Sequence, residues 1–125
     1  MRYALLLISL LVTITAYADD TSSIDSIVNA YYEVVSGPEG FIYDADRDTN
    51  IHADGALITK VFPDGRFQRH DLSTEQAMIS VPYDQAFFEY EVDRRIERYG
   101  NIAHVWSEFE TVSYTHLTLP TTQVV

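Results

Sequence analysis

The chain has no cysteine and few basic residues, and both shortages narrow what the protein can be. Without cysteine it can form no disulfide, cannot be acylated as a lipoprotein, and offers no thiolate ligand to zinc. Its 8 basic residues stand against 19 acidic ones, which gives a formal net charge of −11. Such an acidic surface repels nucleic acid and anionic membranes, so we expect neither as a partner of the mature protein.

The motifs of several cofactor and metal sites are also missing. There is no glycine-rich phosphate loop, no nucleophile elbow and no His-x-x-x-His pair. The run 44–48 resembles the start of a calcium loop, but Thr49 replaces the glycine at its sixth position and Gly55 the glutamate at its twelfth. We therefore expect no cofactor and no metal ion.

No apolar run reaches the ~20 residues that a membrane span needs. The longest begins after Arg2, extends from Ala4 to Ala16, and ends at the small residues Ala16 and Ala18. This pattern is typical of a secretory signal peptide, residues 1–18, cleaved after Ala18. The sequence thus predicts a periplasmic or secreted protein.

The C-terminal segment 112–125 resembles translated adapter DNA rather than a natural protein sequence. Its residues match the translation of a transposase-type sequencing adapter, in which index bases complete Thr122 and encode Gln123 and Val124, and the adapter bases after them give Val125 and a stop. The alternative is a natural threonine-rich strand. We interpret the segment as adapter-derived, which leaves 19–111 as the authentic domain, with its native C-terminus missing.

Residue patterns predict helices at the start of this domain. A first helix starts near Ile24, with Ser22 or Ser23 as its N-cap, and is expected to end at Gly37 in a left-handed cap. A short second helix is predicted over 44–53, a strand and turn over 56–68, and a third helix from Thr74 to about 80, capped by Ser73. The apolar stripe of the first helix comprises Ile24, Ile27, Val28, Tyr31, Val34 and Val35.

A long hairpin follows, from Phe87 to Thr111. Its two runs of strand character meet at 99–101, where Gly100 and Asn101 supply the backbone freedom of a tight reversal. In the second run, Ala103, Val105, Ser107 and Phe109 share the face that is better suited to burial. Helices before a meandering antiparallel sheet predict an α+β domain. The arginines at 94, 95 and 98 are interpreted as cross-strand ion-pair partners on a solvated ribbon.

Three stretches of the chain carry a family resemblance: 30–38, 44–56 and, most specifically, 89–110 with its Tyr99-Gly100-Asn101 turn. Together they resemble the nuclear transport factor 2-like superfamily. The resemblance is to its bacterial SnoaL-like branch and covers essentially all of 24–111. It implies a cone-shaped, curved antiparallel sheet packed against N-terminal helices around one deep apolar pocket, here lacking its last strands. The superfamily contains ketosteroid isomerases, scytalone dehydratase, limonene epoxide hydrolase, polyketide cyclases and non-catalytic binders, so the fold alone does not choose the function.

The resemblance also implies a base in the pocket and a donor that polarises a carbonyl group or water. Candidates for the base are Glu89, His104 and Asp46, and candidates for the donor are Tyr31 and Tyr32. The residues expected to line the pocket are Tyr31, Tyr32, His52 and Glu108. For His104 an alternative stays open, because it could instead lie outside as a cross-strand partner of Glu97 or Asp93.

Two functions remain open at this point. The first is an exported protein that binds a small, largely apolar molecule in the pocket, with or without cofactor-free chemistry of the isomerase, cyclase or dehydratase type. The second is a non-catalytic homodimer or partner-binding module that uses the convex face of the sheet, where Trp106 would be exposed.

Overall fold

The computed structural model describes residues 19–114 and the backbone of 121–124; the expected leader and half of the C-terminal tail, 115–120 and 125, lie outside these residues. The described elements are the helices α2 (Ile24–Val35), α3 (Ala45–Asn50) and α4 (Leu72–Ala77), and the strands β1 (Leu57–Val61), β2 (Phe67–Asp71), β3 (Ala86–Tyr99), β4 (Ile102–Tyr114) and β5 (Thr121–Val124). They form an α+β domain with two antiparallel sheets, β1–β2 and β3–β4–β5. No helix among the described residues is long and apolar enough to cross a membrane.

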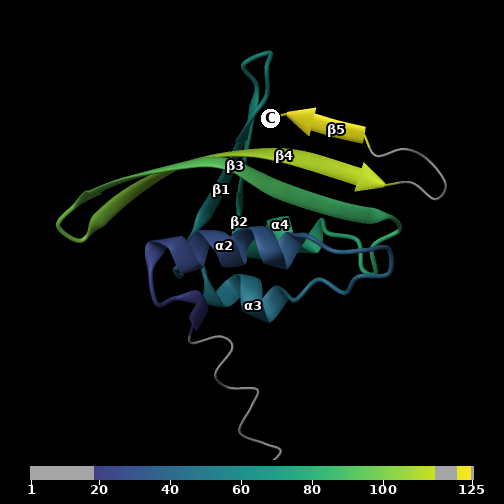
Figure 1. Ribbon diagram of the computed structural model, residues 1–125, viewed down its shortest axis with the longest axis horizontal. Coiled ribbons are helices and arrows are strands. Elements are labelled where there is room, and N and C mark those ends of the chain that lie inside the picture. Colours follow the sequence, from purple (N-terminus) through teal and green to yellow (C-terminus); the bar gives the residue numbers. More distant parts are fainter. Residues whose placement is uncertain (1–18, 115–120, 125) are drawn as a thin grey trace, which may run out of the picture.

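Helix α2 lies against the inner face of β3 and β4 (Figure 1). Ser23 caps it as expected, its Oγ accepting a hydrogen bond from the amide of Ser26 at 3.0 Å. The helix buries Ala30, Tyr32 and Val34, and Val34 is 2 % exposed. These three side chains supply most of the described apolar core, which Tyr43 and Val112 complete.

The end of α2 differs from the prediction. Gly37 does not adopt the left-handed conformation; instead it forms a β-bridge with Phe87, with two backbone hydrogen bonds of 2.8 and 2.9 Å. A side chain at Gly37 would meet the ring of Phe41 at 2.1 Å. Glycine is therefore required here by close packing rather than by backbone conformation. The bridge fixes the end of α2 to the start of β3.

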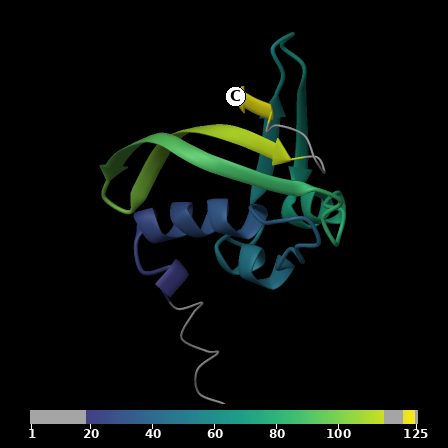
Figure 2. The same ribbon diagram turned by 45° about the vertical axis from the view of Figure 1, so that its right-hand side comes forward.

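Strands β3 and β4 form a long, curved hairpin above the helices (Figures 1 and 2). Gly100 occupies the turn with φ of +56°, so the predicted reversal is confirmed. The register slips by one residue between Glu91 and Asp93, which is a β-bulge at Val92. Because side chains alternate along a strand, the bulge turns Arg94 toward α2, and the prediction that Arg94 lies on a solvated ribbon is wrong.

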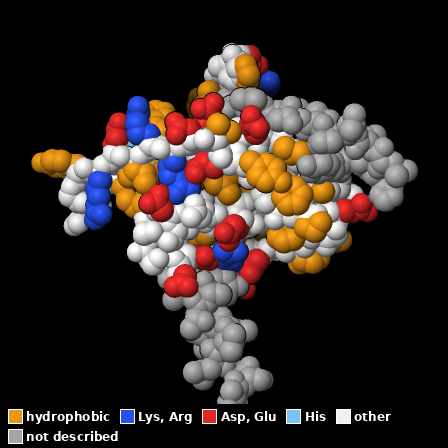
Figure 3. Space-filling model, in the orientation of Figure 1, with side chains coloured by type: hydrophobic (Ala, Val, Ile, Leu, Met, Phe, Trp, Pro, Cys, Tyr) orange, Lys and Arg blue, Asp and Glu red, His pale blue; other side chains and the backbone are white. Residues whose placement is uncertain are grey.

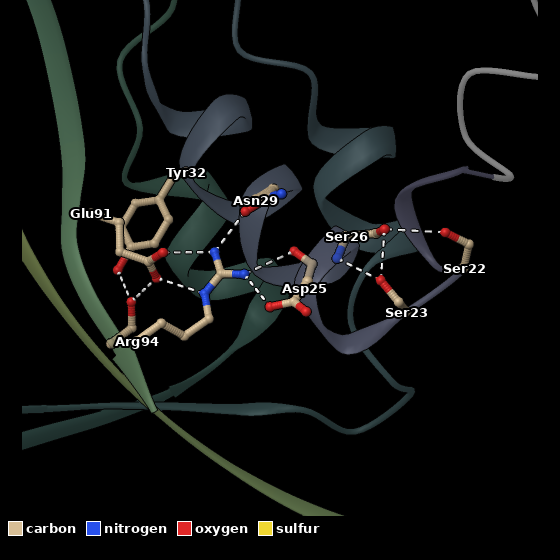
Figure 4. A network of polar contacts seen from close by, with 9 residues as sticks. Ser22, Ser23, Asp25, Ser26, Asn29, Tyr32, Glu91 and Arg94 are labelled. Atoms are coloured by element: carbon tan, nitrogen blue, oxygen red, sulfur yellow. Dashed lines mark hydrogen bonds and ion pairs between the residues drawn. The ribbon is translucent and has the colours of Figure 1, made fainter. Parts of the chain in front are cut away.

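Arg94 connects the sheet to α2 through a network of polar contacts (Figure 4). Its guanidinium donates to Asp25 at 2.7 Å, to Asn29 at 2.6 Å and to Glu91 at 3.0 Å. Glu91 also accepts from the hydroxyl of Ser107. Since Ser107 gives its hydrogen to Glu91, the Tyr32 hydroxyl is the donor in the 2.6 Å contact between Tyr32 and Ser107.

The hairpin β1–β2 forms a sheet of its own and projects past the β3–β4 ribbon (Figure 1). It packs chiefly against α4, a helix that begins two residues earlier than the predicted one. Asp71 rather than Ser73 is its N-cap, because the Asp71 carboxylate accepts from the amide of Thr74 at 2.8 Å. The outward face of the hairpin leaves Leu57, Val61 and Phe67 exposed.

Candidate functional site

A cavity of about 680 Å³ lies between α2, β1, α4 and the first residues of β3. This volume is in the range of small-molecule sites. Its apolar wall combines the side chains of Val35, Ile58, Leu72, Ile79 and Phe87. Its polar wall comprises Tyr31, Asp48, His52, Lys60, Glu75, Gln76, Ser80, Tyr83, Asp84, Gln85 and Glu89.

Glu89 lies on the inner face of β3, where the strand passes the end of α2. Its backbone amide donates to the hydroxyl of Ser36 at 3.1 Å, which fixes the strand at this residue. Its Oε2 is buried and accepts no hydrogen bond from any residue that the structure describes. Burial raises the pKa of the Glu89 carboxyl above its ordinary value, because a charge in a poorly solvated place is disfavoured. The side chain can therefore hold or accept a proton at the cavity wall.

Tyr31 comes to the cavity from α2. Its ring makes edge contacts with the rings of Tyr32 at 5.6 Å and His52 at 6.4 Å. Tyr31 lines the cavity, and 41 % of its surface is exposed to solvent. Burial, together with the nearby carboxylate of Glu89, raises the pKa of Tyr31 to about 12. Its hydroxyl is therefore a proton-bearing donor at neutral pH.

His52 and Asp48 form a second polar group on the cavity wall, at the end of α3. The Nδ1 atom of His52 lies 2.7 Å from the carbonyl oxygen of Asp48, so Nδ1 carries the hydrogen and a neutral ring keeps Nε2 as an acceptor. The Asp48 carboxylate is buried and accepts hydrogen bonds from the hydroxyl of Tyr43 and from Gln76. Burial, and then Asp48, raise the pKa of Tyr43, which remains protonated.

The single lysine of the chain also reaches the cavity, from β1. Lys60 pairs with Glu75 of α4 at 2.6 Å. The other oxygen of Glu75, Oε1, lies 3.9 Å from Nε2 of His70, and both of these atoms are buried without a hydrogen-bond partner among the described residues. Lys60 is the one lysine or arginine among the described lining residues, and Glu75 compensates its charge. No lysine or arginine of the lining is therefore left to pair with the remaining carboxylates of the wall, Asp48, Asp84 and Glu89.

The cavity gathers only some of the residues that the sequence suggested. Tyr31, His52 and Glu89 line it, whereas Tyr32, Asp46, His104 and Glu108 do not. Tyr32 is 9 % exposed and packs between α2 and the sheet, with its ring 5.8 Å from that of Phe109. Asp46 is exposed on α3. The expectation that Tyr32 and Glu108 line the pocket is thus corrected, since a helix turns 100° per residue and alternate strand residues face opposite sides.

The outer face of β3–β4 holds the other two candidates. His104 lies directly across from Glu97 in the strand register, with 4.0 Å between its Nδ1 and Oε2 of Glu97. Its ring packs on Trp106 at 4.7 Å, and Trp106 in turn lies 5.7 Å from the guanidinium of Arg95. Of the two places considered for His104, the outer one, opposite Glu97, is confirmed. Glu108 is exposed on the same face, opposite Asp93.

Sequence reasoning missed several residues of the site, notably Asp48, Lys60, Glu75 and Gln76. They come from three short elements that meet only in the folded chain, and no spacing along the sequence relates them. Within 19–114, no three histidine, aspartate or glutamate side chains converge as a metal site would require. Comparisons with protein-family models, with curated proteins and with solved structures find no match to this chain.

Proposed function

We propose that the protein binds a small molecule with a largely apolar body in the cavity between α2, β1, α4 and β3. The observation that carries this proposal is a cavity of about 680 Å³ whose wall is apolar over most of its area, with a buried carboxyl oxygen of Glu89 that has no partner among the described residues. Pockets of this size with a few convergent polar groups are the usual sites of small-molecule binding. The order of helices and sheets also supports the proposal that the domain is a SnoaL-like member of the nuclear transport factor 2-like superfamily, with a cone-shaped sheet.

The same cavity has the two groups that cofactor-free proton transfer needs. Glu89 would be the base, because its raised pKa brings it closer to neutrality, and Tyr31 the donor to a developing oxyanion. An isomerase, cyclase or dehydratase reaction on a carbonyl compound is the chemistry that we propose for these groups. We propose further that the protein is exported after cleavage behind Ala18, which would make Asp19 the first residue found by N-terminal sequencing of the mature protein.

The binding proposal is tested by blocking the cavity. The neutral fluorophore N-phenyl-1-naphthylamine should show saturable fluorescence enhancement with the wild-type protein. Ile58→Trp should weaken its binding at least tenfold, because Ile58 lines the cavity from β1. Leu57→Trp is the matched control, since Leu57 is its neighbour on the opposite face of the strand and is 63 % exposed. Equal binding by both variants would contradict the proposal.

A second function is favoured by the exposed aromatic surface on the outer face of β3–β4. Trp106 is 53 % exposed and Tyr90 50 %, and aromatic residues are enriched in protein interfaces. We propose homodimer formation through this face as the alternative. Sedimentation velocity should then give a dimer for the wild-type protein and a monomer for Trp106→Glu. Tyr99→Glu at the hairpin tip, where Tyr99 is 89 % exposed, should remain dimeric. A wild-type monomer at high concentration would rule this alternative out.

A further inference from the structure

We infer that the molecule in the cavity carries a protonated amine, and that Glu89 is the residue that anchors it. This inference rests on the proposed small-molecule binding and names the chemical class of the ligand. It is drawn from the charge balance of the cavity wall, from the unpartnered carboxyl oxygen of Glu89 and from the aromatic rings beside it.

The charges of the cavity wall favour a cation. Among its lining residues, Asp48, Glu75, Asp84 and Glu89 carry carboxyl groups, and only Lys60 carries an ammonium group. The 2.6 Å ion pair with Glu75 already compensates Lys60. An anionic ligand would therefore meet an excess of negative charge, whereas a cation is attracted both by the wall and by a chain with a net charge of −11. Figure 3 shows the same imbalance on one outer face, where acidic side chains outnumber basic ones.

Glu89 combines two features: it has no lysine or arginine partner among the described residues, and its buried Oε2 accepts no hydrogen bond from them. Asp48 accepts from Tyr43 and Gln76, and Glu75 pairs with Lys60 through Oε2, although its Oε1, 3.9 Å from Nε2 of His70, has no hydrogen-bond donor among the described residues. A buried polar atom without a partner costs free energy, and an ammonium group would remove that cost by donating a charge-assisted hydrogen bond. The position of Glu89 on β3, held by the hydrogen bond of its amide to Ser36, gives such a donor a fixed target.

Aromatic rings surround the same part of the cavity. Tyr31 and Tyr83 line it together with Glu89. Burial, and then the charge of Glu89, raise the pKa of both phenols. Phe87 is two residues before Glu89 on the same face of β3, and its ring lies 6.5 Å from that of Tyr83. Aromatic faces attract ammonium groups, so these rings would bind both the charge and an apolar body attached to it. In this arrangement the Glu89 carboxylate holds the ammonium group of the ligand, and the base role proposed above applies only to a ligand without one.

The test compares three ligands that share a phenyl body and differ in charge: 2-phenylethylamine, 2-phenylethanol and 3-phenylpropanoate. Isothermal titration of the wild-type protein at neutral pH should give at least tenfold tighter binding of the amine than of the alcohol, with the carboxylate weakest. In Glu89→Gln the preference for the amine over the alcohol should fall to about twofold or less. In Glu108→Gln it should persist, because Glu108 is exposed on the outer face of the sheet and does not line the cavity. Tyr31→Leu, a second variant that keeps Glu89, should weaken the amine more than the alcohol.

Each other outcome overturns a definite part of the inference. Equal binding of all three ligands would reject the amine and leave the proposed small-molecule site intact. Tightest binding of the carboxylate would reject the charge argument. A preference for the amine that survives in Glu89→Gln would reject Glu89 as the anchor. If none of the three ligands and no fluorophore binds, the proposed site itself fails, and this inference fails with it.

Discussion

Glu89 and Glu91 lie two residues apart on the same face of β3, yet their surroundings are opposite. Glu91 accepts hydrogen bonds from Arg94 and Ser107 and belongs to the network that joins the sheet to α2 (Figure 4). Glu89 faces the cavity, and its buried Oε2 has no partner among the described residues. Both are glutamate side chains on the inner face of one strand, so the difference between them is made by what lies opposite.

The hydrogen bonds of a buried glutamate indicate whether it stabilises the fold or is available to bind a ligand. A buried ion pair with complete hydrogen bonds fixes the position of neighbouring elements, and its removal is expected to affect folding. An acid that is left unsatisfied lowers stability and therefore needs another explanation, which a ligand supplies. Three predictions, from the largest effect to the smallest, sharpen this distinction.

Arg94→Met should destabilise the protein by about 2–3 kcal/mol, because it leaves Glu91 part-buried without its cation and frees Asn29 and Asp25. The measurement is urea unfolding followed by circular dichroism. Arg95→Met is the matched control on the outer face of the same strand. The Arg95 side chain is 65 % exposed, and its guanidinium interacts with Trp106 and Glu97 at the surface, so its loss should cost less than about 1 kcal/mol. Equal losses would show that the Arg94 network does not hold α2 to the sheet.

Tyr32→Phe and Tyr31→Phe should separate the two faces of α2. Removing the Tyr32 hydroxyl abolishes its 2.6 Å hydrogen bond to Ser107 and should cost about 1 kcal/mol of unfolding free energy. Removing the Tyr31 hydroxyl should leave stability within about 0.5 kcal/mol, because it makes no hydrogen bond with another described residue. Thermal and urea unfolding measure both losses. A larger loss of stability in Tyr31→Phe than in Tyr32→Phe would show that the Tyr31 hydroxyl, and not the Tyr32 hydroxyl, makes the stabilising hydrogen bond.

Glu89→Gln should change stability least, and in a direction set by pH. Because the pKa of Glu89 is raised on folding above about 4.5, the folded state binds its proton more tightly than the unfolded state. The associated stability is present below pH 4.5 and is lost as the pH rises through the folded pKa. Glutamine has no such loss, so the variant should be more stable than wild type at neutral pH, with the difference shrinking toward pH 4. Unfolding curves measured between pH 4 and 8 check this, and a difference that grows on acidification would contradict it.

The sequence was most informative where one periodic segment determines its own structure. The β3–β4 hairpin, its turn at Gly100 and the half-buried face of Val105, Ser107 and Phe109 follow from the period of two and from turn chemistry. Ala103, predicted for the same face, is exposed near the turn. Helix α2 and its Ser23 cap were equally predictable. The α+β class followed from the order of these elements.

Prediction failed where tertiary packing decides between equivalent local choices. The bulge at Val92 leaves no mark in the residue pattern, yet it reverses the side on which Arg94 lies. Both Tyr31 and Tyr32 fit a helix, and the apolar stripe favoured Tyr31 for packing; the position of the sheet buried Tyr32 instead. The cavity could be expected only as a general feature of the fold that the sequence resembles. Its wall of Asp48, Lys60 and Glu75 comes from elements whose mutual approach depends on the whole chain.

The separation of the two sheets has a mechanical consequence. The cavity has one wall on β1 and another on β3, and among the described residues no backbone ladder connects these strands. The distance between the walls is set by side-chain packing through α4 and α2. The β1–β2 hairpin can therefore move toward or away from β3 when a ligand binds, without breaking a backbone hydrogen bond of either sheet. Ligand binding should therefore slow amide exchange in β1–β2 more than in the middle of β3–β4. That result would show that the site adjusts on the β1–β2 side while the β3–β4 side stays fixed.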